Sequence, residues 1–263
     1  MDAAFDLSPG PGPLVAAAIH DGHAIHPDTL SHVALPEAER LREEDPFTGR
    51  LTSVAPTRIL GRRSRFEIDL NRPPDRAVYR TPDDAWGLDV WGGTVPEAVV
   101  ERSMQVYESF YDAVESLLSL KVQEFGSVVV FDLHSYNHRR EGPDGPVADP
   151  EANPEVNVGT GTLDRQRWGP LVDGFMADLR LGATQAGLDD LDVRENVKFQ
   201  GGHFSQWVHE TFGSAACVLA VEFKKTFMDE WTGAPDRDHL AKLQAALQST
   251  VPGLLEARDA ATP

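Results

Sequence analysis

VVVFDLHSYNHRR, which runs from Val128 to Arg140, joins a wholly apolar run to an acid, a histidine and a serine. The first four residues are β-branched or aromatic, so they predict a strand that is buried on both faces. Asp132, His134 and Ser135 follow at its carboxyl end, and open α/β sheets bind ligands in the crevice beyond such ends. We therefore predict an α/β fold whose chemistry lies at this edge of the sheet.

A second apolar run near the N-terminus ends in the same way. Leu14–Ile19 gives way abruptly to His20, Gly22 and His23, and Pro27 ends the turn. Two histidines three residues apart on a tight turn can point in the same direction. Both predicted strand ends therefore offer imidazoles.

Periodicity predicts further elements along the chain. We expect strands over 65–70, 193–199 and 215–223. We expect helices over 96–124, 163–186 and 238–260, the last interrupted near Pro252. A short helix should follow the glycine turn at 201–202. Residues 137–161 are rich in Pro, Gly and Asp, so we predict a long functional or mobile loop there. Strands that alternate with helices favour parallel pairing through right-handed crossovers.

Length and charge limit the possible functions. A chain of 263 residues can form one large domain, and we predict a single domain over 1–263. Lys and Arg total 24 against 42 Asp and Glu, a formal net charge of −18. The average field therefore repels nucleic acid and anionic membranes, and an anionic ligand must be bound by local positive charge.

The low cysteine content and the lack of a signal-peptide pattern predict a location inside the cell. The single cysteine, Cys217, lies in an apolar run, which predicts a buried structural thiol in a reducing compartment. The N-terminus has neither the basic start nor the apolar core of a signal peptide, and no apolar run is long enough to span a membrane. We predict a cytoplasmic protein, and the sequence leaves its oligomeric state open.

Three histidines form the first candidate site. Catalytic zinc typically has three protein ligands and keeps a fourth position for water. His20, His23 and His134, at two strand ends, could supply these ligands, with Asp21 or Asp132 orienting a ring. The alternative is that they are ordinary polar residues at strand ends.

Asn71, Arg72 and Arg65 form the second candidate site. A guanidinium binds a carboxylate through two hydrogen bonds, and a neighbouring amide can donate another. These residues could therefore bind an anionic substrate at contact range. A surface ion pair with Asp69 or Asp75 explains the same pattern equally well.

Glu222 is the third candidate, because it interrupts the apolar strand ACVLAVEF. A buried carboxylate needs a partner. Near a metal-bound water it could act as general base and then protonate a departing amine. It could also pair with Lys224, Lys225 or an arginine for structural reasons alone.

Five segments, in chain order, resemble a known family. They are SRFEIDLNRPPD, FDLHS, PEVNVGTG, the GGH turn and AVEFKKTFMDE. Together they are similar to N-formylglutamate amidohydrolases and cover most of the chain, from Leu14 to about Glu230. The resemblance implies a three-layer α/β/α sandwich around a mixed, mainly parallel sheet, related to the zinc carboxypeptidases and the aspartoacylase group.

The resemblance also implies roles for the candidate residues. One Zn²⁺ ion would be bound by His20, His23 and His134, and Asn71 with Arg72 would bind the carboxylate of a small substrate. The base would be Glu222, and Arg65 would polarise the scissile carbonyl or stabilise its oxyanion. The implied activity is hydrolysis of an N-acyl amino acid such as N-formylglutamate.

Two segments depart from the family pattern. The turn at His20 reads HDGH, so His23 rests on the analogy with carboxypeptidases, and Glu44 or Asp45 is the alternative ligand. The segment after the GGH turn also differs, and His203 there is a candidate substrate contact. A metallocarboxypeptidase, a cell-wall amidase and a catalytically idle carboxylate-binding protein are the alternative functions.

Overall fold

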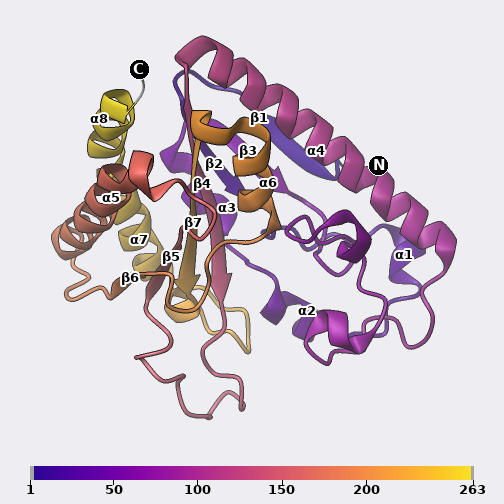
Figure 1. Cartoon of the computed structure of the whole chain (residues 1–263). Coiled ribbons are helices and arrows are strands. Elements are labelled where there is room, and N and C mark those ends of the chain that lie inside the picture. The colour runs from indigo at the N-terminus through magenta and orange to yellow at the C-terminus, as the bar shows by residue number, and fades with distance from the viewer. Residues whose placement is uncertain (1–2, 262–263) are drawn as a thin grey trace.

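The computed structural model describes residues 3–261 and contains a seven-stranded sheet in the order β1-β3-β2-β4-β7-β5-β6 (Figure 1). The strands are β1 (Phe5–Ser8), β2 (Leu14–Ala18), β3 (Thr57–Gly61), β4 (Val128–Tyr136), β5 (Val156–Gly159), β6 (Val193–Glu195) and β7 (Ala216–Lys224). The α-helices are α1 (Pro27–Leu30), α2 (Glu37–Glu43), α3 (Thr48–Leu51), α4 (Glu97–Phe125), α5 (Arg165–Gln185), α6 (His203–Phe212), α7 (Arg237–Ser249) and α8 (Val251–Ala261). Single 3-10 turns are η1 (Thr52–Val54), η2 (Pro74–Arg76), η3 (Pro82–Ala85), η4 (Gly213–Ala215) and η5 (Lys225–Phe227).

The sheet is mixed but mainly parallel. Strands β3, β2, β4 and β7 pair in parallel, whereas β1 runs antiparallel to β3 and β5 runs antiparallel to β7. Strand β6 pairs with β5 in parallel. One apolar cluster joins the sheet to α5, α7 and α8, and a second joins its other face to α4 and α6 (Figure 1). This arrangement confirms the predicted α/β/α sandwich.

The predicted central elements are also confirmed. Strand β4 is buried along its whole length because it lies between β2 and β7 with helices on both faces. Helix α4 begins after Pro96 and ends at Gly126, whose φ of 76° is the left-handed conformation that glycine adopts readily. The predicted break near Pro252 separates α7 from α8. Cys217 is buried in β7, as predicted.

The strand predicted over 65–70 is wrong. Residues 65–67 form a turn, closed by backbone hydrogen bonds from Glu67 and Ile68 to the Ser64 carbonyl, and Asp69 donates to the Ala77 carbonyl. The alternation that suggested a strand instead buries Phe66, Ile68 and Leu70 in the apolar cluster below α4. Asn71 and Arg72 consequently lie in a loop, and the neighbouring parallel strand is β3.

His209 is held as a neutral imidazole between α6 and β7. Its Nε2 accepts a hydrogen bond of 3.0 Å from the Val218 backbone N–H, and its Nδ1 lies 2.8 Å from Thr162 Oγ1. Burial lowers the pKa of His209 from 6.5 to about 4. Between these values the unfolded chain binds more protons than the folded one. The stability that neutral His209 contributes is therefore complete above about pH 6.5 and is lost as the pH falls toward about 4.

We expect the free energy of unfolding to fall more steeply from pH 6.5 to 4 in the wild type than in His209→Gln, which keeps a neutral polar side chain. The difference should reach on the order of 2 kcal/mol in urea titrations. His32→Gln, at an exposed position, is the control and should follow the wild type. Equal slopes for the wild type and His209→Gln would contradict the prediction.

Within residues 3–261, no helix combines the length and the apolar character that crossing a membrane requires.

Candidate metal and substrate site

Three neighbouring parallel strands place candidate residues at one edge of the sheet. His20 follows β2 by two residues, His134 lies near the end of β4, and Glu222 lies near the end of β7. His134 and Glu222 are registered partners on β4 and β7. Because registered residues on parallel strands point to the same face, these two side chains share one side of the sheet.

Each of the two histidine rings is oriented by a buried carboxylate. His20 Nε2 lies 2.7 Å from Asp69 Oδ1, and His134 Nε2 lies 2.8 Å from Asp132 Oδ1. With Nε2 bonded to a carboxylate, Nδ1 is the ring atom that can bind a metal once it carries no proton. The ring centroids are 5.0 Å apart, and both Nδ1 atoms lie within 3.4 Å of one oxygen of Asp45, so they face a common region.

Asp45 supplies a third group from the segment that follows α2. Its backbone N–H donates to the His20 carbonyl at 3.0 Å, which holds this segment against the turn after β2. Asp45 Oδ2 lies 3.0 Å from His134 Nδ1 and 3.4 Å from His20 Nδ1. The three residues each offer one ligand atom within 4.8 Å of the others, and all three are buried.

This donor set fits a divalent transition metal. Imidazole nitrogens and a carboxylate oxygen are ordinary zinc ligands, and carboxylates that orient the rings accompany most histidine ligands. Burial alone would raise the pKa of Asp45, but hydrogen bonds from His134 and His20 hold that pKa below its ordinary value. Burial alone would lower the pKa of His134, but Asp132 and Asp45 raise it. The negative charge of Asp45 and Asp132, which favours a proton on His134, would also favour a metal cation at this place.

His23 lies outside this group. Its Nδ1 is 2.5 Å from Glu44 Oε2, its Nε2 is 3.2 Å from Glu37 Oε1, and the ring is 34% exposed. Ser64 donates to the other oxygen of Glu44, so that carboxylate is occupied as well. Of the two alternative acids, the structure brings Asp45 to the rings and pairs Glu44 with His23. Our proposed ligand set therefore contains Asp45 in place of His23.

The other carboxylates near the turn have structural partners. Asp132 orients His134, as predicted, and also accepts a hydrogen bond from Ser205 at 2.9 Å. Asp21 instead accepts from the Gly49 backbone N–H. The role of Asp69 in orienting His20 was missed, although its position between the apolar residues Ile68 and Leu70 was a signal that it could be buried.

Arg65 lies beside the group formed by His20, Asp45 and His134. Its guanidinium is 2.8 Å from Asp69 Oδ2 and donates to Tyr79 Oη at 3.2 Å. Tyr79 also donates to the same Asp69 oxygen. The Trp86 ring covers the guanidinium, and Arg65 Cζ lies 4.8 Å from the ring centroid. Arg65 is therefore oriented by buried partners while it lines the cavity.

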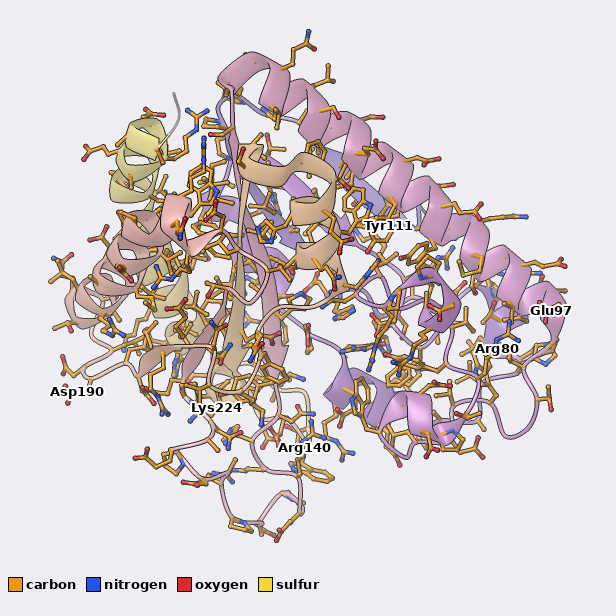
Figure 2. All side chains as sticks on the ribbon, in the orientation of Figure 1. Arg80, Glu97, Tyr111, Arg140, Asp190 and Lys224 are labelled. Carbon is orange, nitrogen blue, oxygen red and sulfur yellow. The ribbon has the colours of Figure 1, made fainter. Side chains whose placement is uncertain are left out.

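The loop with Asn71 and Arg72 is held between α4 and α6. Tyr111, labelled in Figure 2, donates to the Leu70 carbonyl at 2.7 Å, and Tyr107 donates to the Arg72 carbonyl at 3.0 Å. Asn71 Oδ1 accepts from the first turn of α6 at 2.9 Å. Gly202 is required here because an added Cβ would lie 2.3 Å from the Asn71 amide.

These groups open onto one cavity of about 780 Å³. Its walls include all predicted site residues except His23, together with Asp45. Trp86 and Arg140 line it as well, and Arg140 comes from the long loop predicted over 137–161. Burial raises the pKa of Glu222 to about 7, a value suited to a group that both takes and returns a proton near neutral pH.

The fold and the site define a class: α/β proteins with a buried His–Asp–His group that could hold a metal ion at the carboxyl ends of parallel strands. Comparison with known families makes the assignment specific. Residues 12–228 match the family model of N-formylglutamate amidohydrolase, and the chain belongs to that family. This result confirms the resemblance in the sequence motifs, and the family name denotes hydrolases of amide C–N bonds.

Of three similar solved structures, the first two share the fold at low sequence identity. An N-formylglutamate amidohydrolase from Ralstonia eutropha JMP134 is 19% identical with a TM-score of 0.77, over 98% of this chain and 100% of that chain. A gene product from Agrobacterium tumefaciens is 19% identical with a TM-score of 0.56, and the match covers 98% of this chain and 96% of that chain. A metallo-carboxypeptidase from Burkholderia cenocepacia is 14% identical with a TM-score of 0.41, over 95% and 58%. No curated protein matches the chain.

Proposed function

We propose that this protein is a zinc-dependent amidohydrolase that cleaves the amide bond of an N-acyl amino acid, such as N-formylglutamate. The observation that carries the proposal is the convergence of His20, Asp45 and His134 in a cavity that Glu222 and Arg72 also line. Family membership supports an amide as the bond that is cleaved.

His20, Asp45 and His134 would hold one Zn²⁺ ion. When bound, the ion would lower the pKa of a water molecule and polarise the scissile carbonyl. Asp69 and Asp132 orient the two imidazoles so that each presents Nδ1 to the ion. Arg65 balances part of this negative charge through its contact with Asp69.

Glu222 would act as the base and then as the acid. It would take one proton from the attacking water and deliver it to the departing nitrogen. A C–O bond forms and the C–N bond breaks, so the products are a carboxylic acid and a free amine. Arg65 would donate to the carbonyl oxygen as negative charge develops there.

Asn71 and Arg72 would bind the free carboxylate of the substrate, and His203 would contact the substrate nearby. Arg72 is 28% exposed and lies 3.9 Å from Asp69, a distance that leaves its guanidinium free to form shorter bonds with a ligand. The amide of Asn71 is oriented by α6. One side of the cavity, at Arg72, is therefore positively charged and suited to a carboxylate, and the other, at Asp45, is negatively charged and suited to a metal ion.

Arg72→Ala should raise KM for N-acyl amino acids roughly 10- to 100-fold, with a smaller change in kcat, because a charge-assisted hydrogen bond to the substrate is lost. Steady-state kinetics on a substrate and its carboxamide analogue would measure the effect. Arg76→Ala removes the same charge from an exposed turn and is the control. An equal rise in KM for the carboxamide would exclude carboxylate binding by Arg72.

The size of the cavity supports a small substrate. A volume of about 780 Å³ is within the range of small-molecule sites, roughly 300–1,000 Å³. An N-acyl amino acid fits within this volume. The position of Glu222 beside the candidate ligand His134, in the same cavity, favours an enzyme over an idle binding protein, because binding alone requires no base.

Metal analysis of the purified protein, combined with a hydrolysis screen, tests the proposal. We expect one Zn²⁺ per chain and release of free amine from N-formyl or N-acetyl amino acids. Dipeptides are the comparison substrates, and preferential cleavage of dipeptides would support a peptidase instead. A chain that neither binds a metal nor hydrolyses any of these amides would contradict the proposed function.

A further inference from the structure

Lys225 is a buried cation that the proposed mechanism does not use. It follows β7, three residues after Glu222, and is 1% exposed. Its Nζ donates to the carbonyl oxygens of Arg42 at 2.5 Å and Glu44 at 2.7 Å. The ammonium group thus links the end of β7 to a segment about 180 residues earlier in the chain.

The two carbonyls lie at the end of α2, immediately before Asp45. Helix α2 ends at Glu43, and the last carbonyls of a helix have no partner within it. A cation at this end also interacts favourably with the helix dipole. Since the Glu44 carbonyl belongs to the peptide bond that joins Glu44 to Asp45, Lys225 holds the backbone directly next to the candidate ligand.

Other contacts hold the same segment from the opposite side. The Asp45 N–H donates to the His20 carbonyl, and the Glu44 side chain binds His23 and Ser64. These contacts join the segment to the turn after β2. Lys225 supplies a connection to β7, the strand that carries Glu222.

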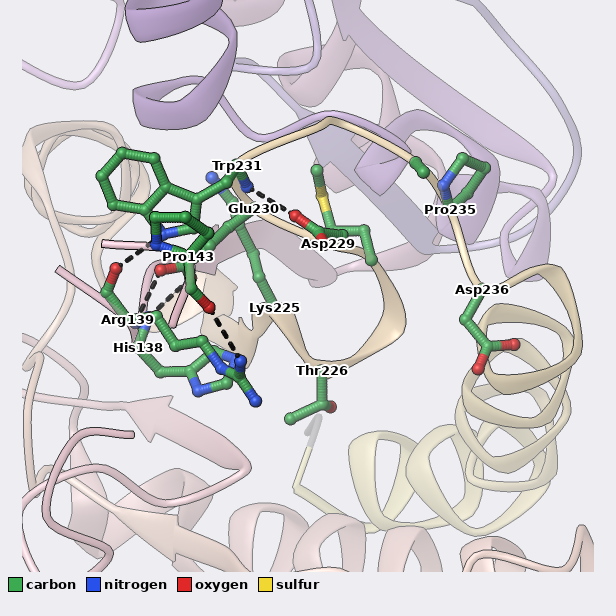
Figure 3. Close-up of a pocket in the computed structure, with 12 residues that line it drawn as sticks. His138, Arg139, Pro143, Lys225, Thr226, Asp229, Glu230, Trp231, Pro235 and Asp236 are labelled. Carbon is green, nitrogen blue, oxygen red and sulfur yellow. Dashed lines mark hydrogen bonds between the residues drawn. The ribbon is translucent and has the colours of Figure 1, made fainter. Parts of the chain in front are cut away.

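Open space surrounds Lys225 on two sides. It lines the cavity of the candidate site and also a second cavity of about 510 Å³. Figure 3 shows this second cavity, with Lys225 next to Glu230 and Trp231. Besides the stacking of Arg42 on Trp231, with Cζ 4.2 Å from the ring centroid, the two hydrogen bonds from Lys225 hold the end of α2 against the residues that follow β7.

We propose that Lys225 is a positioning residue that holds Asp45 where it can bind a metal ion, and so sets the affinity of the site. This inference rests on the metal site of the proposed function. Loss of the ammonium group would leave two buried carbonyls without their donor, and the end of α2 would shift to reach water. Asp45 would then spend less time beside His20 and His134.

Lys225→Met tests the inference because Met has a similar length but no donor. Zn²⁺ affinity is measured on the folded, metal-free protein by competition with a chromophoric chelator. We expect affinity to fall about 10- to 100-fold, the usual effect of losing a group that orients a ligand. Lys224→Met removes the same charge one residue earlier, at the end of β7 (Figure 2), and should bind Zn²⁺ like the wild type.

Lys225→Gln keeps amide donors on a shorter side chain and serves if Lys225→Met fails to fold. Its affinity should be at least several-fold below that of the wild type. Wild-type affinity in a folded Lys225 variant, or an equal loss in Lys224→Met, would overturn the positioning role alone. A wild-type chain that binds no Zn²⁺ would overturn the metal site, and this inference with it.

Discussion

Glu222→Gln should retain its metal and lose about 10²- to 10⁴-fold in kcat, the usual contribution of general acid–base catalysis. Glutamine matches the shape of glutamate but cannot accept the proton of the attacking water or deliver it to the leaving nitrogen. Stopped-assay kinetics with metal analysis of the same sample measure both properties. Since the amide keeps the packing around β7, the fold should be unchanged.

Glu43→Gln is the matched control, because Glu43 lines the same cavity and its carboxylate is 3.6 Å from Arg140. We expect this variant to keep most of the activity. Full turnover in Glu222→Gln would remove Glu222 from the mechanism. A drop of equal size in both variants would indicate that the negative charge of the cavity matters, rather than one base.

The pH dependence of kcat/KM gives a second readout for Glu222. Burial raises its pKa to about 7, and a bound cation would shift that value downward. A base works only when ionised, so the wild-type rate should fall as the pH drops below this pKa. The acidic limb should be absent from the residual activity of Glu222→Gln.

Asp45→Asn should weaken Zn²⁺ binding by more than about 100-fold. Loss of a group that only orients a ligand already costs about 10- to 100-fold, and Asp45 would contribute both a ligand atom and a negative charge. Equilibrium dialysis against buffered Zn²⁺ measures the loss directly. Hydrolysis should fall with metal occupancy, because the candidate chemistry requires the ion.

His23→Gln distinguishes the two ligand sets. The His23 ring binds Glu44 and Glu37 in the structure, so we expect His23→Gln to bind Zn²⁺ far more tightly than Asp45→Asn does. Some weakening is expected, since Glu44 is the neighbour of Asp45. The opposite order of affinities would restore His23 as the ligand and remove Asp45.

Buried elements were the most predictable part of the fold. The apolar run at the start of β4 and the apolar residues spaced three and four apart in α4 indicate burial from the local sequence alone. Both elements lie where predicted. Strands β1, β3 and β5 were not predicted, because each is only four or five residues long and carries little periodicity. Strand β4 also extends to Tyr136, so His134 lies within the strand rather than beyond it.

The segment 65–70 shows why alternation alone is insufficient. Phe66, Ile68 and Leu70 alternate with polar residues and are buried, as in a strand. Their backbone groups bond within turns, because β3 already occupies the sheet position beside β2. Whether a strand partner is available depends on the whole sheet, and a local window does not contain that information.

The sequence by itself determined the family, the α/β class and the chemical types that meet at the site: imidazoles, a late-strand glutamate and an Asn-Arg pair. Only the tertiary structure decided which acid joins the imidazoles. Asp45 is held toward the rings by the hydrogen bond from its N–H to the His20 carbonyl and by the bond from Lys225 to the Glu44 carbonyl. The His23 ring is held by Glu44 and Glu37. Such contacts join segments that are distant in the chain, so spacing along the sequence carries no record of them.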